Sequence, residues 1–176
     1  MTEYYLDNDI INMCEHFADT VISTNIDCYR KRKQYNIDKI KQDIFLGKLA
    51  EWGVFFIYLS RGCTNILPPD MKVYSRNKKS FDGDLKWGLY NLHIKSQTFE
   101  SADRYGDSWI FQCKDPLFAY SSEYDIIIGC RVSINSDGCF IEIKLEKPFK
   151  NLVFDNTRLS KFVGDKKAVY LKDNND

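Results

Sequence analysis

The segment Leu89-Tyr90-Asn91-Leu92-His93-Ile94-Lys95 decides much of the fold, because its apolar and polar side chains alternate. This alternation predicts a β-strand over Leu89–Ser96. Successive side chains of a strand point to opposite faces, so one face carries Asn91, His93, Lys95 and Gln97. A polar face of this kind is either solvated or one wall of a site.

Two acidic residues precede this strand. Asp82 and Asp84 flank Gly83, and Asp82-Gly83 is a turn signal. Asp84 also opens a short apolar run, so Asp84–Trp87 is predicted to be a strand. Asp84 is therefore either a turn residue or a carboxylate at the start of a strand next to Lys95.

A third carboxylate lies on a predicted helix that begins at a cap near Asn36 and runs to about residue 60. Glu51 interrupts the apolar face of this helix. Gly47, one turn earlier, leaves room for another backbone or a ligand. Glu51 either borders a cleft, or it turns outward or pairs with Lys48 or Arg61.

The same signals place the other elements. A first helix follows Asp7 or Asn8 and continues to Ile22, and a short helix follows Asn156. Further strands are predicted at Met71–Ser75, Ser108–Gln112, Tyr124–Ser133, Cys139–Leu145 and Ala168–Leu171, with a hairpin turn at Asn135–Gly138. The polar connection Thr98–Asp107 is typical of a loop. Helices followed by strands predict an α+β (α/β) fold with a mixed central β-sheet flanked by helices. One domain is expected over 1–176, mainly helical in 1–62 and mainly strands in 70–172.

The composition narrows the class of protein. The chain has 176 residues, of which 44% are hydrophobic, and its 25 basic residues balance 25 acidic ones, so nucleic-acid binding requires local patches. Six cysteines without a C-x-x-C pair, and only two histidines, argue against zinc and indicate reduced thiols in a cytoplasmic, intracellular protein. No apolar run approaches the roughly 18 residues of a membrane span and no signal peptide is evident, so no membrane partner is expected.

The carboxylates and the lysine favour metal-assisted hydrolysis of a phosphodiester. Magnesium takes oxygen ligands, usually one or two carboxylates together with water and substrate phosphate. Asp84, Glu51 and the carbonyl of Ile94 are the candidate ligands. The ion would lower the pKa of a bound water, and Lys95 would position or deprotonate that water.

The order of Glu51 on a helix, then Asp84, then His93-Ile94-Lys95 resembles the restriction-endonuclease-like superfamily, the PD-(D/E)xK nucleases. The resemblance covers roughly Lys39 to Gln112 and implies a restriction-endonuclease-like fold and a nuclease that depends on magnesium, or on manganese in its place. In it, Asp84 takes the place of the motif aspartate, Lys95 that of the motif lysine, and Glu51 that of the helical acid. Pro69-Asp70 is a literal Pro-Asp but lies farther from the lysine. His93 stands where the family usually has an acid, which lowers the expected metal affinity and makes it a candidate general base.

Basic and aromatic residues near this motif are candidate contacts to DNA. Gln97 lies beyond Lys95 on the same face and could reach the phosphate or a metal-bound water. The candidate nucleic-acid contacts are Arg30, Lys31, Arg32, Lys33, Arg76, Lys78, Lys79, Arg104 and Tyr105. Cations neutralise phosphates and aromatic rings stack on bases, although each cluster alone is also typical of solvated surface.

The leading hypothesis is a magnesium-dependent DNA endonuclease, encoded by a phage or mobile element and active in the host cytoplasm. A domain of this size needs a homodimer to cut both strands together. His93 favours a second hypothesis, a catalytically weak nucleic-acid-binding module on the same scaffold. The neutral charge and the 15% aromatic content favour a third, a protein-interaction domain.

Overall fold

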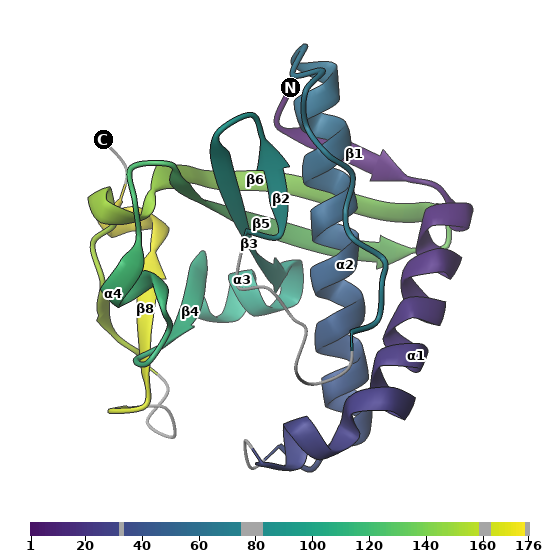
Figure 1. The fold of residues 1–176 in the computed structure, drawn as a ribbon, viewed down its shortest axis with the longest axis horizontal. Coiled ribbons are helices and arrows are strands. Elements are labelled where there is room, and N and C mark those ends of the chain that lie inside the picture. The colour runs from purple at the N-terminus through teal and green to yellow at the C-terminus, as the bar shows by residue number, and fades with distance from the viewer. Residues whose placement is uncertain (32–33, 75–82, 159–162, 175–176) are drawn as a thin grey trace.

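The computed structural model describes residues 1–31, 34–74, 83–158 and 163–174 (Figure 1). Its helices are α1 (Asn8–Lys31), α2 (Ile37–Ser60), α3 (Phe99–Tyr105) and α4 (Leu117–Tyr120), with 3-10 turns at Phe149–Asn151 and Leu171–Asp173. Its strands are β1 (Glu3–Leu6), β2 (Leu85–Trp87), β3 (Tyr90–Thr98), β4 (Ser108–Gln112), β5 (Asp125–Asn135), β6 (Gly138–Pro148), β7 (Asp155–Asn156) and β8 (Lys166–Tyr170).

The strands form two sheets. A mixed sheet has the order β1-β6-β5-β3-β2, in which β3 and β5 are parallel and the other neighbours are antiparallel. A smaller antiparallel sheet has the order β4-β8-β7. In Figure 1, α2 crosses the five-stranded sheet, α1 lies beside α2, and the smaller sheet stands on the other side of the molecule.

The two faces of the five-stranded sheet bury different hydrophobic clusters. Ile128 on β5 belongs to the cluster that includes Val54 of α2. Its neighbour Ile127 belongs to a second cluster, with Trp109 and Val169 of the smaller sheet. Because adjacent strand residues point to opposite faces, α2 covers one face and the smaller sheet packs on the other.

This arrangement fixes the orientation of β3. Leu92 and Ile94 are buried in the cluster on the α2 side. By alternation, His93 and Lys95 therefore face the smaller sheet. The polar face predicted from the sequence is therefore not simply exposed to solvent, because the smaller sheet lies opposite it.

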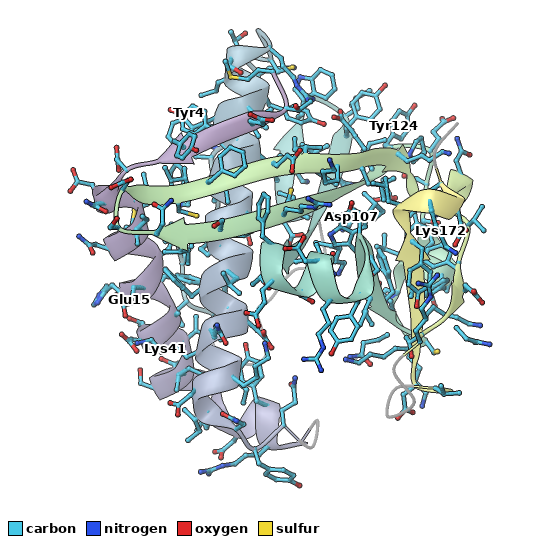
Figure 2. All side chains as sticks on the ribbon, turned by 180° about the vertical axis from the view of Figure 1, so that it is seen from behind. Tyr4, Glu15, Lys41, Asp107, Tyr124 and Lys172 are labelled. Carbon is cyan, nitrogen blue, oxygen red and sulfur yellow. The ribbon has the colours of Figure 1, made fainter. Side chains whose placement is uncertain are left out.

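Local signals account for the helix ends and for the contact between the two long helices. The Asn36 side chain accepts a hydrogen bond from the Lys39 backbone N–H at 2.9 Å and caps α2. Lys41 on α2 lies 2.7 Å from Asp19 and 3.5 Å from Glu15 of α1, and Figure 2 shows the Glu15 and Lys41 side chains on adjoining helices. These exposed ion pairs contribute little stability individually but hold α1 in register on α2.

Most elements agree with the sequence-based expectations. The helix expected from Asn36 to about residue 60 is confirmed, as are the mixed α+β composition and the mixed sheet with helices. The Asn135–Gly138 hairpin is confirmed by the pairing of Asn135 with Gly138. The expected strands at 84–87, 89–96, 108–112, 124–133, 139–145 and 168–171 correspond to β2, β3, β4, β5, β6 and β8.

Other features differ from the expectations. Residues 71–74, expected to belong to a strand, form none. The connection Thr98–Asp107, expected to be a loop, contains the helix α3, because Thr98 caps this helix and Gly106, at φ 76°, ends it. β1 was not expected, because its four residues are held by pairing with the distant β6. The first helix runs past Ile22 to Lys31. The strands form two sheets rather than one, and the helix expected after Asn156 falls largely outside the described residues.

None of the helices described is both long and apolar enough to cross a membrane.

Candidate functional site

The β2–β3 hairpin brings Asp84 against the candidate lysine motif. Leu85 pairs with Leu92, so Asp84, one residue earlier, lies opposite His93. Asp84 Oδ2 accepts a hydrogen bond from the backbone N–H of Ile94 at 2.7 Å. The carboxylate is thereby fixed on the peptide that separates His93 from Lys95.

Gly83 makes this close approach feasible. A Cβ atom at Gly83 would lie 2.9 Å from both the Leu92 backbone nitrogen and the Asn91 Cβ. Backbone atoms cannot give way as a flexible side chain can, so a larger residue would push the segment before β2 away from β3. The sequence Gly83-Asp84 therefore places the carboxylate against the neighbouring strand.

Lys95 is half-buried and lies over an aromatic ring. Its Nζ lies 5.0 Å from the centre of the Phe111 ring on β4, a cation–π contact. No carboxylate in the described ranges pairs with it. An ammonium group held in this way remains available to an anion.

Lys95 lines a cavity of about 470 Å³ between the two sheets, α2 and α3. Arg158 also lines it, with its guanidinium carbon 4.4 Å from the Tyr170 ring centre. Lys39 lines it as well but pairs with Asp43 at 2.7 Å. Further lining residues are Gly47, Ile94, Ser96, Gln97, Thr98, Ser101, Tyr105, Ser108, Trp109 and Thr157.

Glu51 is engaged within α2 and with its surroundings. Its Oε2 lies 2.5 Å from Nζ of Lys48, and only 12% of each side chain is exposed. Lys48 also donates to the carbonyl of Asp70 at 3.1 Å and lies 4.8 Å from the Phe17 ring centre. Burial raises the pKa of the neighbouring Cys14 thiol to about 12, and the charge of Glu51 adds to this increase. The pairing with Lys48 is one of the alternatives that the sequence left open.

His93 contacts an aspartate, Asp125, that was not among the residues predicted for the site. Its Nε2 lies 2.9 Å from Asp125 Oδ1 at the start of β5, and both side chains are largely buried. Asn91 donates to the same oxygen at 3.2 Å, and Ser122 donates to Oδ2 through both its backbone N–H and its hydroxyl at 2.7 Å. Burial alone would raise the pKa of Asp125, but the hydrogen bonds from His93 and Ser122 outweigh it and lower that pKa to about 2. Like Asp84, Asp125 lies at the start of an apolar strand, and this position is the sequence signal that could have marked it as a site residue.

The amide of Gln97 is occupied by the backbone of the α3–β4 turn. Its nitrogen donates to the carbonyl of Gly106 at 3.1 Å, and its oxygen accepts from the N–H of Ser108 at 3.0 Å. Nearby, Asp107, which is labelled in Figure 2, forms a bidentate pair with Arg131 of β5 at 2.6 and 2.8 Å. Gln97 therefore shapes the cavity wall.

The predicted basic contacts are only partly described. Arg30 pairs with Asp27 at 3.2 Å near the end of α1, and Lys31 is the last residue of this helix. Arg104 lies 5.2 Å from the ring centre of Tyr105, which lines the cavity. The other predicted contacts, Arg32, Lys33, Arg76, Lys78 and Lys79, lie outside the described residues.

The described residues do not bring three candidate metal-ligating side chains together. Across 1–31, 34–74, 83–158 and 163–174, no group of three or more His, Cys, Asp or Glu is placed to hold one ion. Magnesium often takes only one or two carboxylates, with water and substrate supplying the rest. The exposed Asp84 beside the Ile94 peptide fits such a sparse donor set, whereas Glu51 would first have to leave Lys48.

No protein-family model, curated protein or solved structure matches this chain. Its function is therefore inferred from the residues described above.

Proposed function

We propose that this protein is a magnesium-dependent endonuclease that hydrolyses phosphodiester bonds in DNA and also accepts manganese. The observation that carries the proposal is the hydrogen bond from the Ile94 backbone N–H to Asp84. It holds Asp84, the residue that precedes β2, against β3, the strand that carries Lys95. The resemblance to the PD-(D/E)xK nucleases implies a neighbouring acid and lysine of this kind. The mixed sheet with helices is consistent with a restriction-endonuclease-like fold.

Each residue has a distinct role in this proposal. Asp84 and the Ile94 carbonyl would hold the ion, with Glu51 joining once it is released from Lys48. A bound divalent ion would lower the pKa of a water and stabilise charge on the phosphate. Lys95 would bind a phosphate oxygen or orient the attacking water, since no described carboxylate competes for its ammonium.

His93 and Asp125 would act together in the same reaction. The Asp125 carboxylate fixes the orientation of the imidazole through Nε2. A carboxylate in contact with one ring nitrogen fixes the tautomer and leaves the other nitrogen to exchange a proton with water or substrate. Asp125 is thus a positioning residue for His93.

A second candidate function is DNA binding without cleavage. Two observations favour it: His93 occupies the position of the usual acid, and Glu51 is paired with Lys48. A binding module of this kind would use the cations of the cavity and would not respond to magnesium. The two candidates differ in one measurable property, which is turnover.

A cleavage assay on single- and double-stranded DNA, with magnesium or with a chelator, tests the nuclease proposal. We expect cleavage only with the metal, and a loss of at least about 100-fold in the Asp84→Asn and Lys95→Met variants. The matched controls are Asp137→Asn in the β5–β6 turn and the exposed Lys114→Met, which should cleave as the wild type does. Circular dichroism would establish that the variants fold. Unchanged cleavage by folded Lys95→Met would exclude the proposed site.

A further inference from the structure

The cavity between the two sheets concentrates positive charge in a chain that is neutral overall. Among the described residues, three cations line it, and one of them, Lys39, is paired with Asp43 of the cavity wall. Lys95 and Arg158 each lie over an aromatic ring, and none of the described carboxylates pairs with either. Ring faces hold these cations in place without neutralising them, so the cavity is suited to an anion.

The wall of the cavity also offers groups that recognise a nucleotide. Tyr105 lines it, and 37% of this residue is exposed, so a base can stack on its ring beside the Arg104 guanidinium, which lies 5.2 Å from the ring centre. Ser96 lines the same space, and a serine hydroxyl can donate to phosphate or sugar oxygens. A cationic groove with an exposed aromatic ring is the usual design for binding a single nucleic-acid strand.

The volume of the cavity limits the size of the ligand that it can hold. Its volume of about 470 Å³ falls within the range of small-ligand sites, roughly 300–1,000 Å³. It is far larger than a metal ion needs and far too small to admit a duplex. One nucleotide unit is the part of a DNA chain that matches it.

We propose that this cavity binds one unpaired nucleotide of a DNA strand, with its phosphate between Lys95 and Arg158 and its base against Tyr105. The inference rests on the proposed function for the identity of the polymer. It adds that the enzyme acts on single-stranded, flapped or frayed DNA. Lys95 then links the two sites, because it belongs both to the β3 motif and to the cavity wall.

The test is fluorescence anisotropy with a labelled single-stranded oligonucleotide and with a blunt duplex of the same sequence, both in chelator so that no cleavage occurs. We expect the single strand to bind at least about tenfold more tightly. Arg158→Gln should weaken this binding. The plot of log K against log salt, whose slope is negative, should become shallower by roughly 0.7, the value for one phosphate contact on a single strand. Tyr105→Ala should weaken binding by roughly tenfold, and Tyr105→Phe should not.

Lys150→Gln is the matched control, since it removes one positive charge at an exposed position outside the cavity. Its affinity should change less than that of Arg158→Gln. Equal binding of duplex and single strand, or a wild-type salt slope in Arg158→Gln, would overturn the cavity assignment. Selective binding of the single strand without any metal-dependent cleavage would support nucleotide binding in the cavity and contradict the nuclease proposal. The two proposals can therefore fail separately.

Discussion

At the scale of single residues, Asp125 is an ionisable group held by several hydrogen bonds. It is 7% exposed, yet it accepts four hydrogen bonds, and its pKa is lowered from 3.8 to about 2. The folded state therefore favours the ionised form more than the unfolded state does. This preference stabilises the protein above about pH 4, and the stabilisation is lost as the pH falls toward 2.

We accordingly predict that Asp125→Asn lowers the free energy of unfolding at pH 7 by about 2 kcal/mol. The difference from wild type should shrink as the pH is lowered from about 4 to 2, because the wild-type carboxyl is then protonated too. Urea unfolding at several pH values measures this. The exposed neighbour Glu123→Gln is the control and should leave the pH profile unchanged. A difference that stays constant down to pH 2 would contradict the linkage.

At the scale of elements, the outcome of sequence reasoning depended on how local each signal was. α2 was predictable because its cap, Asn36, and its apolar pattern lie within the helix itself. β3 and the approach of Asp84 were predictable from alternation and a short hairpin. The contact of His93 with Asp125 was not, because it depends on the parallel pairing of β3 with β5 across an intervening connection.

The helix α3 illustrates a signal that was present in the sequence but was not used. The Thr98 hydroxyl accepts from the Ser101 N–H at 3.2 Å, and Gly106 ends the helix. We predict that Thr98→Ala lowers the free energy of unfolding by about 1 kcal/mol, because an N-terminal N–H of the helix loses its acceptor. Thr98→Ser keeps the oxygen and should cost much less. Thermal unfolding of the two variants tests this, and equal losses would mean that packing rather than capping stabilises α3.

At the scale of the whole molecule, the close approach of the two sheets depends on Gly129 of β5. A Cβ atom there would lie 2.5–2.7 Å from ring atoms of Trp109, which is almost fully buried and donates to the carbonyl of Cys130 at 3.3 Å. Gly129 is also the β5 partner of Lys95. The spacing between the sheets, and with it the cavity, therefore requires a glycine at this position.

We predict that Gly129→Ala lowers the free energy of unfolding by roughly 1–3 kcal/mol, since the indole must move in a packed core. Gly47→Ala is the matched control: a Cβ there meets nothing within 4 Å, and alanine is the better helix former by about 1 kcal/mol. It should therefore raise the stability. Chemical denaturation compares the two variants, and a neutral Gly129→Ala would show that the sheets are not closely packed there.

The cavity itself could not be predicted, because its walls belong to both sheets. The smaller sheet forms when β4 pairs with β8, which follows it by more than fifty residues of chain. No periodicity within β4 or β8 indicates that partner. Arg158 and Tyr170 were accordingly absent from the predicted site, whereas Lys95 was found from the pattern of its own strand.

The edges of the five-stranded sheet have one more consequence. Its outer strands, β1 and β2, contain four and three residues, while the inner β5 and β6 contain eleven each. Open strand backbone is the template on which amyloid-like growth begins. β5 is paired on both sides, whereas β1 covers only Cys139–Glu142 of β6 and β2 covers only Tyr90–Leu92 of β3. An incoming chain that adds to the native sheet should therefore pair beside these short outer strands, and β5 should join a fibril only after unfolding.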